Sequence, residues 1–172
     1  MRAFLAVIFF SCAAFAQNDA AIAQAKSACG PDKIHFDLEA TDFTDSIAQP
    51  ASGKALVYVI GQEVDYPGGI IARIGLDGTW VGAVNGKSHL SFSVDPGEHH
   101  VCANWQSVLA ERNKYVALSS LTVEAGKVYY VRMRLTVQGQ YSPPILDIEV
   151  VNPDEGKYLV LTSEVSESHA KK

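Results

Sequence analysis

The sequence predicts an all-β protein, an antiparallel β-sandwich with a short C-terminal helix. Three turn-forming sequences divide the hydrophobic stretch 74–105 into consecutive short strands: Asp-Gly at 77–78, Asn-Gly at 85–86 and Asp-Pro-Gly-Glu at 95–98. The two dipeptides tolerate the positive φ values of tight hairpins, and proline and glycine favour a longer loop at the third site. We therefore expect the rest of the chain to pack around the meander that these turns connect.

Residues 1–16 have the features of a secretory signal peptide. Arg2 precedes an apolar run that ends in the small-x-small pattern at 14–16. We expect cleavage before Gln17 and a mature protein that is exported to the periplasm or secreted. Cys12 is a possible lipid-anchor site, but the residues at 9–11, Phe-Phe-Ser, differ from those usual before a lipidated cysteine, so we favour simple cleavage.

The full sequence has 172 residues, of which 48% are hydrophobic. The part that follows the signal peptide has the length and composition of one globular domain. We expect a leader at 17–53, which contains an edge strand at 33–40 and a linker, then a β-sandwich domain at 54–162 and a disordered tail at 163–172. The edge strand alternates apolar and polar residues.

Three patterns define the expected core. Residues 55–60 are apolar on both faces, which predicts a central strand. Residues 127–137 alternate regularly, with the odd positions inward, and a hairpin turn at 124–127 precedes them. Asn152 followed by proline and two acids predicts a helix that begins at Pro153 and ends near Thr162.

The charge and motif content argue against several classes of function. Cleavage of the signal peptide leaves 13 basic and 19 acidic residues, a formal charge of −6 without a basic cluster, which argues against nucleic acid or an anionic membrane surface as partner. No apolar run is long enough for a membrane span. The phosphate-loop-like stretch 82–88 has three residues between its glycines instead of four, and no GxSxG is present. We expect no cofactor and no catalytic residues.

The histidines offer an alternative, metal-dependent chemistry. His99 and His100 are adjacent on a predicted strand and therefore point to opposite faces. His100 and Cys102 share a face, and with His35 they can hold zinc if the cysteine is a free thiolate. An exported compartment argues against a free thiolate, and we interpret His99 as a half-buried residue that closes a hairpin.

Two candidate binding surfaces remain. The loop at 63–69 is the longest irregular insertion of the core, and its residues Tyr66, Pro67, Gly68 and Gly69 are typical of a functional loop, although a plain connection explains them too. Trp80 and Trp105, with the tyrosines at 129–130, can form a stacking surface for sugars, but strand aromatics are more often core residues.

A family resemblance rests on the order and spacing of several short motifs: Leu-Asp-Gly at 76–78, Val-Gly at 81–82, Phe92 and Val94, Pro-Gly-Glu-His-His-Val at 96–101 and Ala-Gly-Lys-Val-Tyr-Tyr at 125–130. This order is similar to the PEGA type of small extracytoplasmic β-domain. More specifically, residues 53–151 resemble bacterial secreted domain-of-unknown-function family 2846. The resemblance implies a prealbumin-like or immunoglobulin-like sandwich, exported and sometimes lipid-anchored, with no established catalytic residues.

The pairing of the cysteines is predicted from the residues themselves. Cys29 and Cys102 are the cysteines left after cleavage of the signal peptide, in a compartment where thiols oxidise. If the neighbours of Cys102 face the core, its side chain points to the other face, where the strand at 34–38 can lie. We predict a disulfide, with a buried free thiol or a metal ligand at Cys102 as the alternatives.

The function that these observations favour is an exported, non-catalytic module that binds an envelope component or a protein partner through its sheet faces or end loops. The alternative is a metal-dependent enzyme or metal-binding protein that uses His100 and Cys102. A free thiol at Cys102 distinguishes them, because only the alternative requires it.

Overall fold

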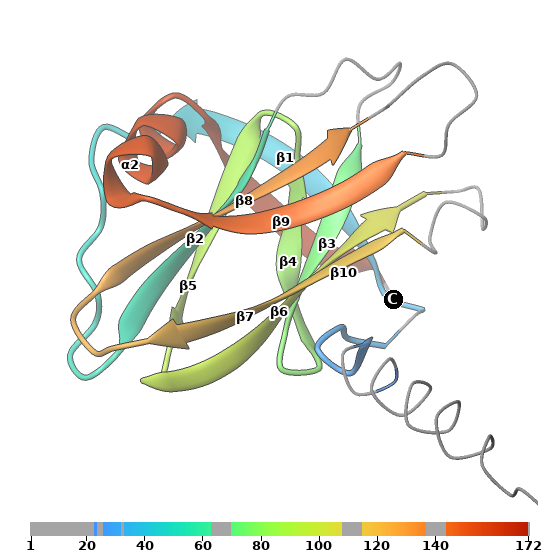
Figure 1. Cartoon of the computed structure of the whole chain (residues 1–172). Helices are drawn as coiled ribbons and strands as arrows, with labels where there is room; N and C mark the ends of the chain where they lie inside the picture. Colours follow the sequence, from blue (N-terminus) through green and yellow to red (C-terminus); the bar gives the residue numbers. More distant parts are fainter. Residues whose placement is uncertain are drawn as a thin grey trace, which may run out of the picture.

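The computed structural model describes residues 23, 26–31, 33–62, 70–107, 115–136 and 144–171 (Figure 1). The elements in this part of the chain are β1 (His35–Phe43), β2 (Ala55–Gly61), β3 (Ile71–Leu76), β4 (Thr79–Asn85), β5 (Ser88–Val94), β6 (Gly97–Gln106), β7 (Val116–Val123), β8 (Val128–Thr136), β9 (Ile145–Val151), α2 (Pro153–Leu161) and β10 (Glu164–Lys171). One sheet has the order β1-β10-β5-β2-β8-β9 and the other the order β4-β3-β6-β7.

The two sheets enclose one main hydrophobic core. Val57 and Val59 of β2 and Val131 and Met133 of β8 meet Ile74 and other residues of the four-stranded sheet, all of them buried. This arrangement confirms the prediction of an all-β protein with two sheets. The prediction that the sandwich is antiparallel holds only for the four-stranded sheet. The six-stranded sheet is mixed, because β2 runs parallel to β8 and β10 runs parallel to β5.

The predicted central strand and the predicted alternation of β8 are both present. Every residue of β2 is buried, as a strand with both faces covered requires. On β8, Val131, Met133 and Leu135 face the core. Tyr130 points to the opposite face, as predicted, yet it is only 2% exposed because α2 covers it.

The predicted meander is wrong in its pairing. The hairpin turn between β3 and β4 forms as expected, with Asp77 and Gly78 at positive φ. At the Asn85-Gly86 turn, however, the chain passes from the four-stranded sheet to the six-stranded one, and it returns after β5. The turn at 124–127 likewise connects two sheets, because β7 and β8 do not pair. Strand β3 pairs with β4, as expected, and on its other side with β6.

The C-terminal helix forms as predicted. The side chain of Asn152 accepts hydrogen bonds from the backbone N–H groups of Asp154 and Glu155, so it caps the helix N-terminus. Gly156 lies against the ring of Tyr130, where a Cβ would overlap the ring. Arg132 of β8 donates to Glu155 of α2 and thereby helps to hold the helix on the sheet.

The tail at 163–172, expected to be disordered, is largely a strand. Residues Glu164–Lys171 form β10, which pairs along its length with β1 and at its start with β5. The edge strand predicted at 33–40 corresponds to β1, which occupies the end of the six-stranded sheet. Strand β10 carries only two apolar residues, Val165 and Ala170, which explains why its pattern does not predict a strand.

Strand β10 also covers the edge of β4 in the other sheet. The hydroxyl of Ser168 accepts a hydrogen bond from the backbone N–H of Ala83 at 3.0 Å, and the hydroxyl of Ser166 donates to the carbonyl of Ala83 at 2.6 Å. Ala83 is fully buried. Two serine side chains therefore satisfy edge groups that would otherwise lie without a partner away from water.

We expect Ser166→Ala and Ser168→Ala each to lower the free energy of unfolding by about 1–3 kcal/mol, because each leaves one buried backbone group of Ala83 unpaired. Urea unfolding measures the change. Ser120→Ala, at an exposed position of β7, is the control and should stay within about 0.5 kcal/mol of the parent. Two serine variants as stable as this control would contradict the assigned role.

Cys29 and Cys102 lie at disulfide distance on the outer face of the four-stranded sheet, with Cα atoms 5.2 Å apart. Val101 and Ala103 face the core, so Cys102 points away from it, as predicted. The residues that cover Cys102 are those around Ala28, which is 2% exposed. The strand expected at this face, β1, pairs in the other sheet, but its start reaches this face, where the carbonyl of Ile34 accepts a hydrogen bond from Arg73.

The disulfide closes a loop with a sequence separation of 73 residues. The chain-entropy model gives a stabilisation of about 4 kcal/mol for a loop of this size. We therefore expect reductant to lower the free energy of unfolding of the wild type by an amount of this order in urea titrations. The double variant Cys29→Ala/Cys102→Ala is the control, and its unfolding should not respond to reductant. A wild-type curve that is equally unaffected would refute the prediction.

Candidate functional site

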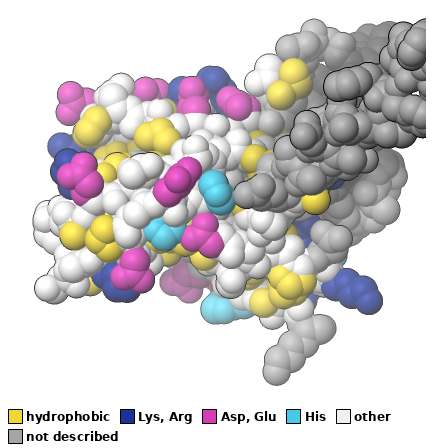
Figure 2. Space-filling model, turned by 60° about the horizontal axis from the view of Figure 1, so that its bottom comes forward, with side chains coloured by type: hydrophobic (Ala, Val, Ile, Leu, Met, Phe, Trp, Pro, Cys, Tyr) yellow, Lys and Arg dark blue, Asp and Glu magenta, His cyan; other side chains and the backbone are white. Residues whose placement is uncertain are grey.

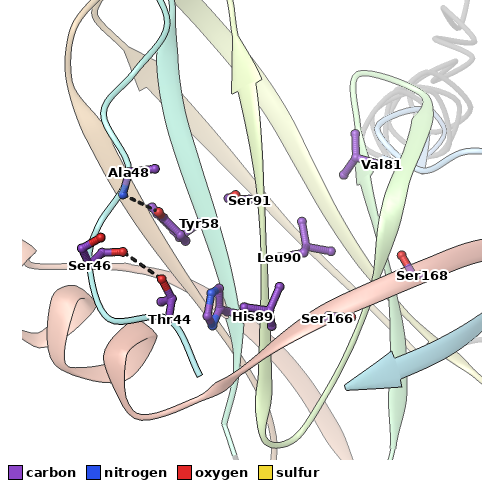
Figure 3. A pocket seen from close by; sticks show the side chains of 11 residues that line it. Thr44, Ser46, Ala48, Tyr58, Val81, His89, Leu90, Ser91, Ser166 and Ser168 are labelled. Atoms are coloured by element: carbon purple, nitrogen blue, oxygen red, sulfur yellow. Dashed lines mark hydrogen bonds between the residues drawn. The ribbon is translucent and has the colours of Figure 1, made fainter. Parts of the chain in front are cut away.

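The described residues form a groove where β10 separates from β5. The two strands pair only through Glu164 with Ser88 and Val165 with His89, and β10 then turns toward the edge of β4. The opening between them has a volume of about 510 Å³ (Figure 3). Segments far apart in the chain line it, because the loop after β1 and parts of β2, β4, β5 and β10 meet there.

The lining of the groove combines hydroxyl groups with a small apolar surface. Its hydroxyl-bearing residues are Thr44, Ser46, Tyr58, Ser91, Ser166 and Ser168. Leu90 and Val81 contribute apolar surface on the side of the sandwich core. None of the described residues that line this groove is a lysine, an arginine or a carboxylate. The surroundings therefore suit an uncharged ligand that offers both hydrogen-bonding groups and apolar groups.

His89 and Tyr58 are titratable residues of this groove with buried side chains, and the environment of His89 defines its tautomer. The Nδ1 atom of His89 lies 2.9 Å from the hydroxyl of Ser163, and that hydroxyl donates its own hydrogen to the carbonyl of Leu159 at 2.8 Å. Ser163 must therefore accept from Nδ1–H, which leaves Nε2 as an acceptor. Burial lowers the pKa of His89 below its ordinary value of 6.5, although the contact with Ser163 opposes this shift.

Tyr58 is held rigidly beside His89. Its ring stacks on Tyr130 at a centroid distance of 5.7 Å and an interplanar angle of 12°, and it is tilted against His89. The Tyr58 hydroxyl accepts from the backbone N–H of Ala48 at 3.0 Å. This contact ties the 44–48 segment to the sheet, as the dashed line in Figure 3 shows. One wall of the groove is thus preorganised.

The arrangement supports binding better than nucleophilic catalysis. The hydroxyl that touches His89 belongs to Ser163, and its proton already bonds to a backbone carbonyl. His89 therefore donates to Ser163 and does not act as its base. The chemistry available in the groove is hydrogen bonding, with Nε2 of His89 as an acceptor, the hydroxyls of Ser91 and Ser168 as donors, and that of Ser166 as an acceptor only, because its hydrogen bonds to Ala83.

A second histidine, His99, lies near the start of β6. On the face of the molecule that Figure 2 shows, histidine and acidic side chains lie close together. The two ring nitrogens of His99 contact Asp77 Oδ2 at 2.6 Å and the carbonyl of Asp95 at 2.8 Å. Both partners are acceptors, so the geometry suits the doubly protonated ring. Burial opposes the charge, but the hydrogen bonds and the charges of these aspartates outweigh it and raise the pKa of His99. His99 is half-buried, as predicted, but the turn beside it does not close a hairpin, because it connects β5 and β6 of different sheets.

The same contact changes the pKa of Asp77 in the opposite direction. Burial tends to raise this pKa, but the backbone N–H of His100, which donates to Oδ1 at 2.8 Å, and the ring of His99 together lower it below 3.8. The ionised carboxylate of Asp77 therefore stabilises the folded protein at pH values above its ordinary pKa, and this stabilisation is lost as the pH falls through the lowered pKa. Stability from His99 is present below about 6.5 and is lost as the pH rises through its raised pKa.

We expect His99→Gln to lower the free energy of unfolding more at about pH 5.5 than at about pH 9, by up to about 1 kcal/mol, the range of exposed ion pairs. Urea unfolding of wild type and variant at both pH values measures this difference. The contribution of His89 to the pH dependence cancels in the comparison, because His89 is present in both proteins. His169→Gln, at an exposed position of β10 in the other sheet, is the control. An equal effect of His99→Gln at the two pH values would speak against the ion pair.

The predicted binding surfaces have different outcomes. Tyr66, Pro67, Gly68 and Gly69 lie outside the described residues. Trp105 is not a surface aromatic, because it is 3% exposed and belongs to the core. Trp80 lies half-buried on the outer face of its sheet, where its indole N–H donates to the carbonyl of Pro31 at 2.8 Å and Arg73 stacks on its ring. The two tryptophans therefore do not share a surface.

The metal alternative loses its sulfur ligand. The Sγ atom of Cys102 is at bonding distance from that of Cys29, so it cannot be the free thiolate that a site with His100 requires. Among the residues that the structure describes, no group of three or more histidine, cysteine or acidic side chains is arranged to hold a metal ion. In the same part of the chain, no helix combines the length and apolar character of a membrane span.

The groove residues were not predicted from the sequence. Two serine-rich segments have the same spacing, a step of three residues and then a step of two: Ser88, Ser91 and Ser93 on β5, and Ser163, Ser166 and Ser168 around the start of β10. That pattern is the signal that points to them, but it becomes informative only when β10 is known to be a strand beside β5. Comparisons with other proteins add no site, since no family model, curated protein or solved structure matches this chain.

Proposed function

We propose that the protein is an exported, non-catalytic β-sandwich module that binds an envelope component or a protein partner in the groove between β5 and β10. The observation that carries this proposal is the groove itself, about 510 Å³ in volume and lined by hydroxyls, Tyr58 and the buried His89. A volume of this size lies within the range of ligand sites. The rigid wall around Tyr58 means that little ordering is needed on binding.

The proposal includes export to the periplasm or to the outside of the cell. The signal-peptide pattern of residues 1–16 supports it. The pairing of Cys29 with Cys102 is consistent with an oxidising compartment, because such bonds are rare where thiols are kept reduced.

We also infer that the sandwich is of the prealbumin-like or immunoglobulin-like type and related to family 2846 and PEGA-like domains. The motif order within residues 53–151 supports this relationship. Two packed sheets agree with the general architecture. A fold of this kind hosts many binding functions, so the site and not the fold carries the functional argument.

The experiment compares two tyrosine substitutions on one strand. Ser91→Tyr places a large side chain in the groove, whereas Ser93→Tyr adds the same ring two residues further along the same exposed face, outside the groove lining. Mature protein from Gln17 onward is used to capture components from its native envelope extract. We expect wild type and Ser93→Tyr to retain the same component and Ser91→Tyr to retain at least tenfold less of it.

Thermal unfolding establishes that both variants are folded before capture. If Ser91→Tyr retains as much of each component as Ser93→Tyr does, the groove is not the binding site and the proposal is wrong.

A further inference from the structure

We propose that the ligand of this groove is an extended polypeptide segment that adds as a strand to the free edge of β5. This inference rests on the proposed function and specifies the chemistry of the ligand. Its central observation is that β5 is paired with β2 along its length but with β10 only at Ser88 and His89. From Ser91 onward, the described residues provide no strand neighbour on that side.

The register shows which backbone groups face the opening. The N–H of Leu56 on β2 donates to the carbonyl of Lys127, which directly precedes β8, so the backbone groups of Leu56 face β8. The backbone groups of the next residue, Val57, therefore face β5, where its partner is Phe92. Because successive residues of a strand direct their N–H and C=O groups to opposite sides, Ser91 and Ser93 direct theirs away from β2. These two residues offer two donors and two acceptors to an incoming chain.

Strand β10 shows how a chain binds at this edge. The N–H of Glu164 donates to the carbonyl of Lys87 at 3.0 Å, and the parallel pairing continues through Val165 with His89. After this point β10 leaves for the edge of β4, and the groove opens in the position that its next residues would have occupied. An added segment therefore continues an existing pairing.

The two sides of the groove predict the sequence character of the segment. Side chains of an added strand alternate between the core side, where Leu90 and Val81 offer apolar contacts, and the outer side, where Tyr58 and His89 lie. The acceptor Nε2 of His89 suits a hydroxyl or amide donor. We expect segments that alternate apolar residues with serine, threonine, asparagine or glutamine.

The edge of β5 also lacks the usual protection against strand addition. Exposed edges commonly carry lysine, another charged residue or proline, which prevent unwanted pairing. Strand β5, Ser88–Val94, has none of these residues. The edge of β4, in the other sheet, is covered by the serine hydroxyls of β10. The edge of β4 is therefore protected against strand addition, whereas the edge of β5 is not.

Selection from a random library tests this inference directly. Heptapeptides displayed on phage are selected on the mature chain and counter-selected on Ser91→Tyr. We expect enriched sequences with alternating apolar and polar residues. The most enriched peptide is then synthesised in two forms, one unmodified and one N-methylated at every second residue on the edge that would face β5. We expect the N-methylated peptide to bind at least tenfold more weakly, because it lacks those donors.

A protein variant provides the reciprocal measurement. Ser93→Pro removes one N–H donor that is directed away from β2, toward the added strand, but none that faces β2, and proline is tolerated on a strand edge. We expect it to weaken binding of the selected peptide at least tenfold, whereas Ser93→Ala leaves binding unchanged. If the proline variant does not fold, the N-methylated peptide still tests the same hydrogen bonds.

Failure of this inference differs from failure of the proposed function. If no selected peptide depends on the groove, or if N-methylation leaves the affinity unchanged, strand addition is wrong. Loss of an envelope component in Ser91→Tyr alone would then still support the groove as a binding site for a different ligand.

Discussion

Strand β10 lies beside two edges that belong to different sheets, and one strand cannot pair fully with both. It forms backbone pairs with β5 at Glu164 and Val165. Further along, the hydroxyls of Ser166 and Ser168 form hydrogen bonds with the backbone of β4. Side-chain hydroxyls can satisfy backbone groups across a distance at which a strand ladder does not form. As a result, the edge of β4 is closed while the edge of β5 stays open. The groove is the direct geometric consequence of this division.

The position of β10 depends in turn on β1, whose start is fixed at the outer face of the four-stranded sheet. There Arg73, 3% exposed, donates to the carbonyl of Ile34 and to Asn104, and it stacks on Trp80 at 4.5 Å. A buried cation is tolerated only where such partners satisfy it, so the chain at Ile34 cannot easily move away. The disulfide at Cys29 fixes the same segment five residues earlier. Strand β1 therefore begins at a defined point and can pair with β10 in one register.

The sequence predicts those parts of the fold that local chemistry determines. The fully apolar β2, the Asn152 cap and the positive-φ turn at Asp77 each follow from a few neighbouring residues. The choice of partner strand depends on the whole chain. An Asn-Gly turn forms equally well within a hairpin or between two sheets, which explains why β4 and β5 were wrongly predicted to pair. The groove required β10, and a strand with polar residues on both faces has no periodic pattern to reveal it.

An open strand edge invites self-association, and the walls of this groove limit that risk. A second copy that paired through its own sheet edge would bring neighbouring strands with it, and those strands need space on both sides of β5. That space is occupied by the 44–48 segment, which is tied to Tyr58, on the outer side, and by β10 on the other. A single extended segment needs only the width of one strand, about 5 Å. The recess therefore favours an isolated chain over a sheet edge, so a serine-lined, uncharged edge can persist without the charged residues that usually prevent aggregation.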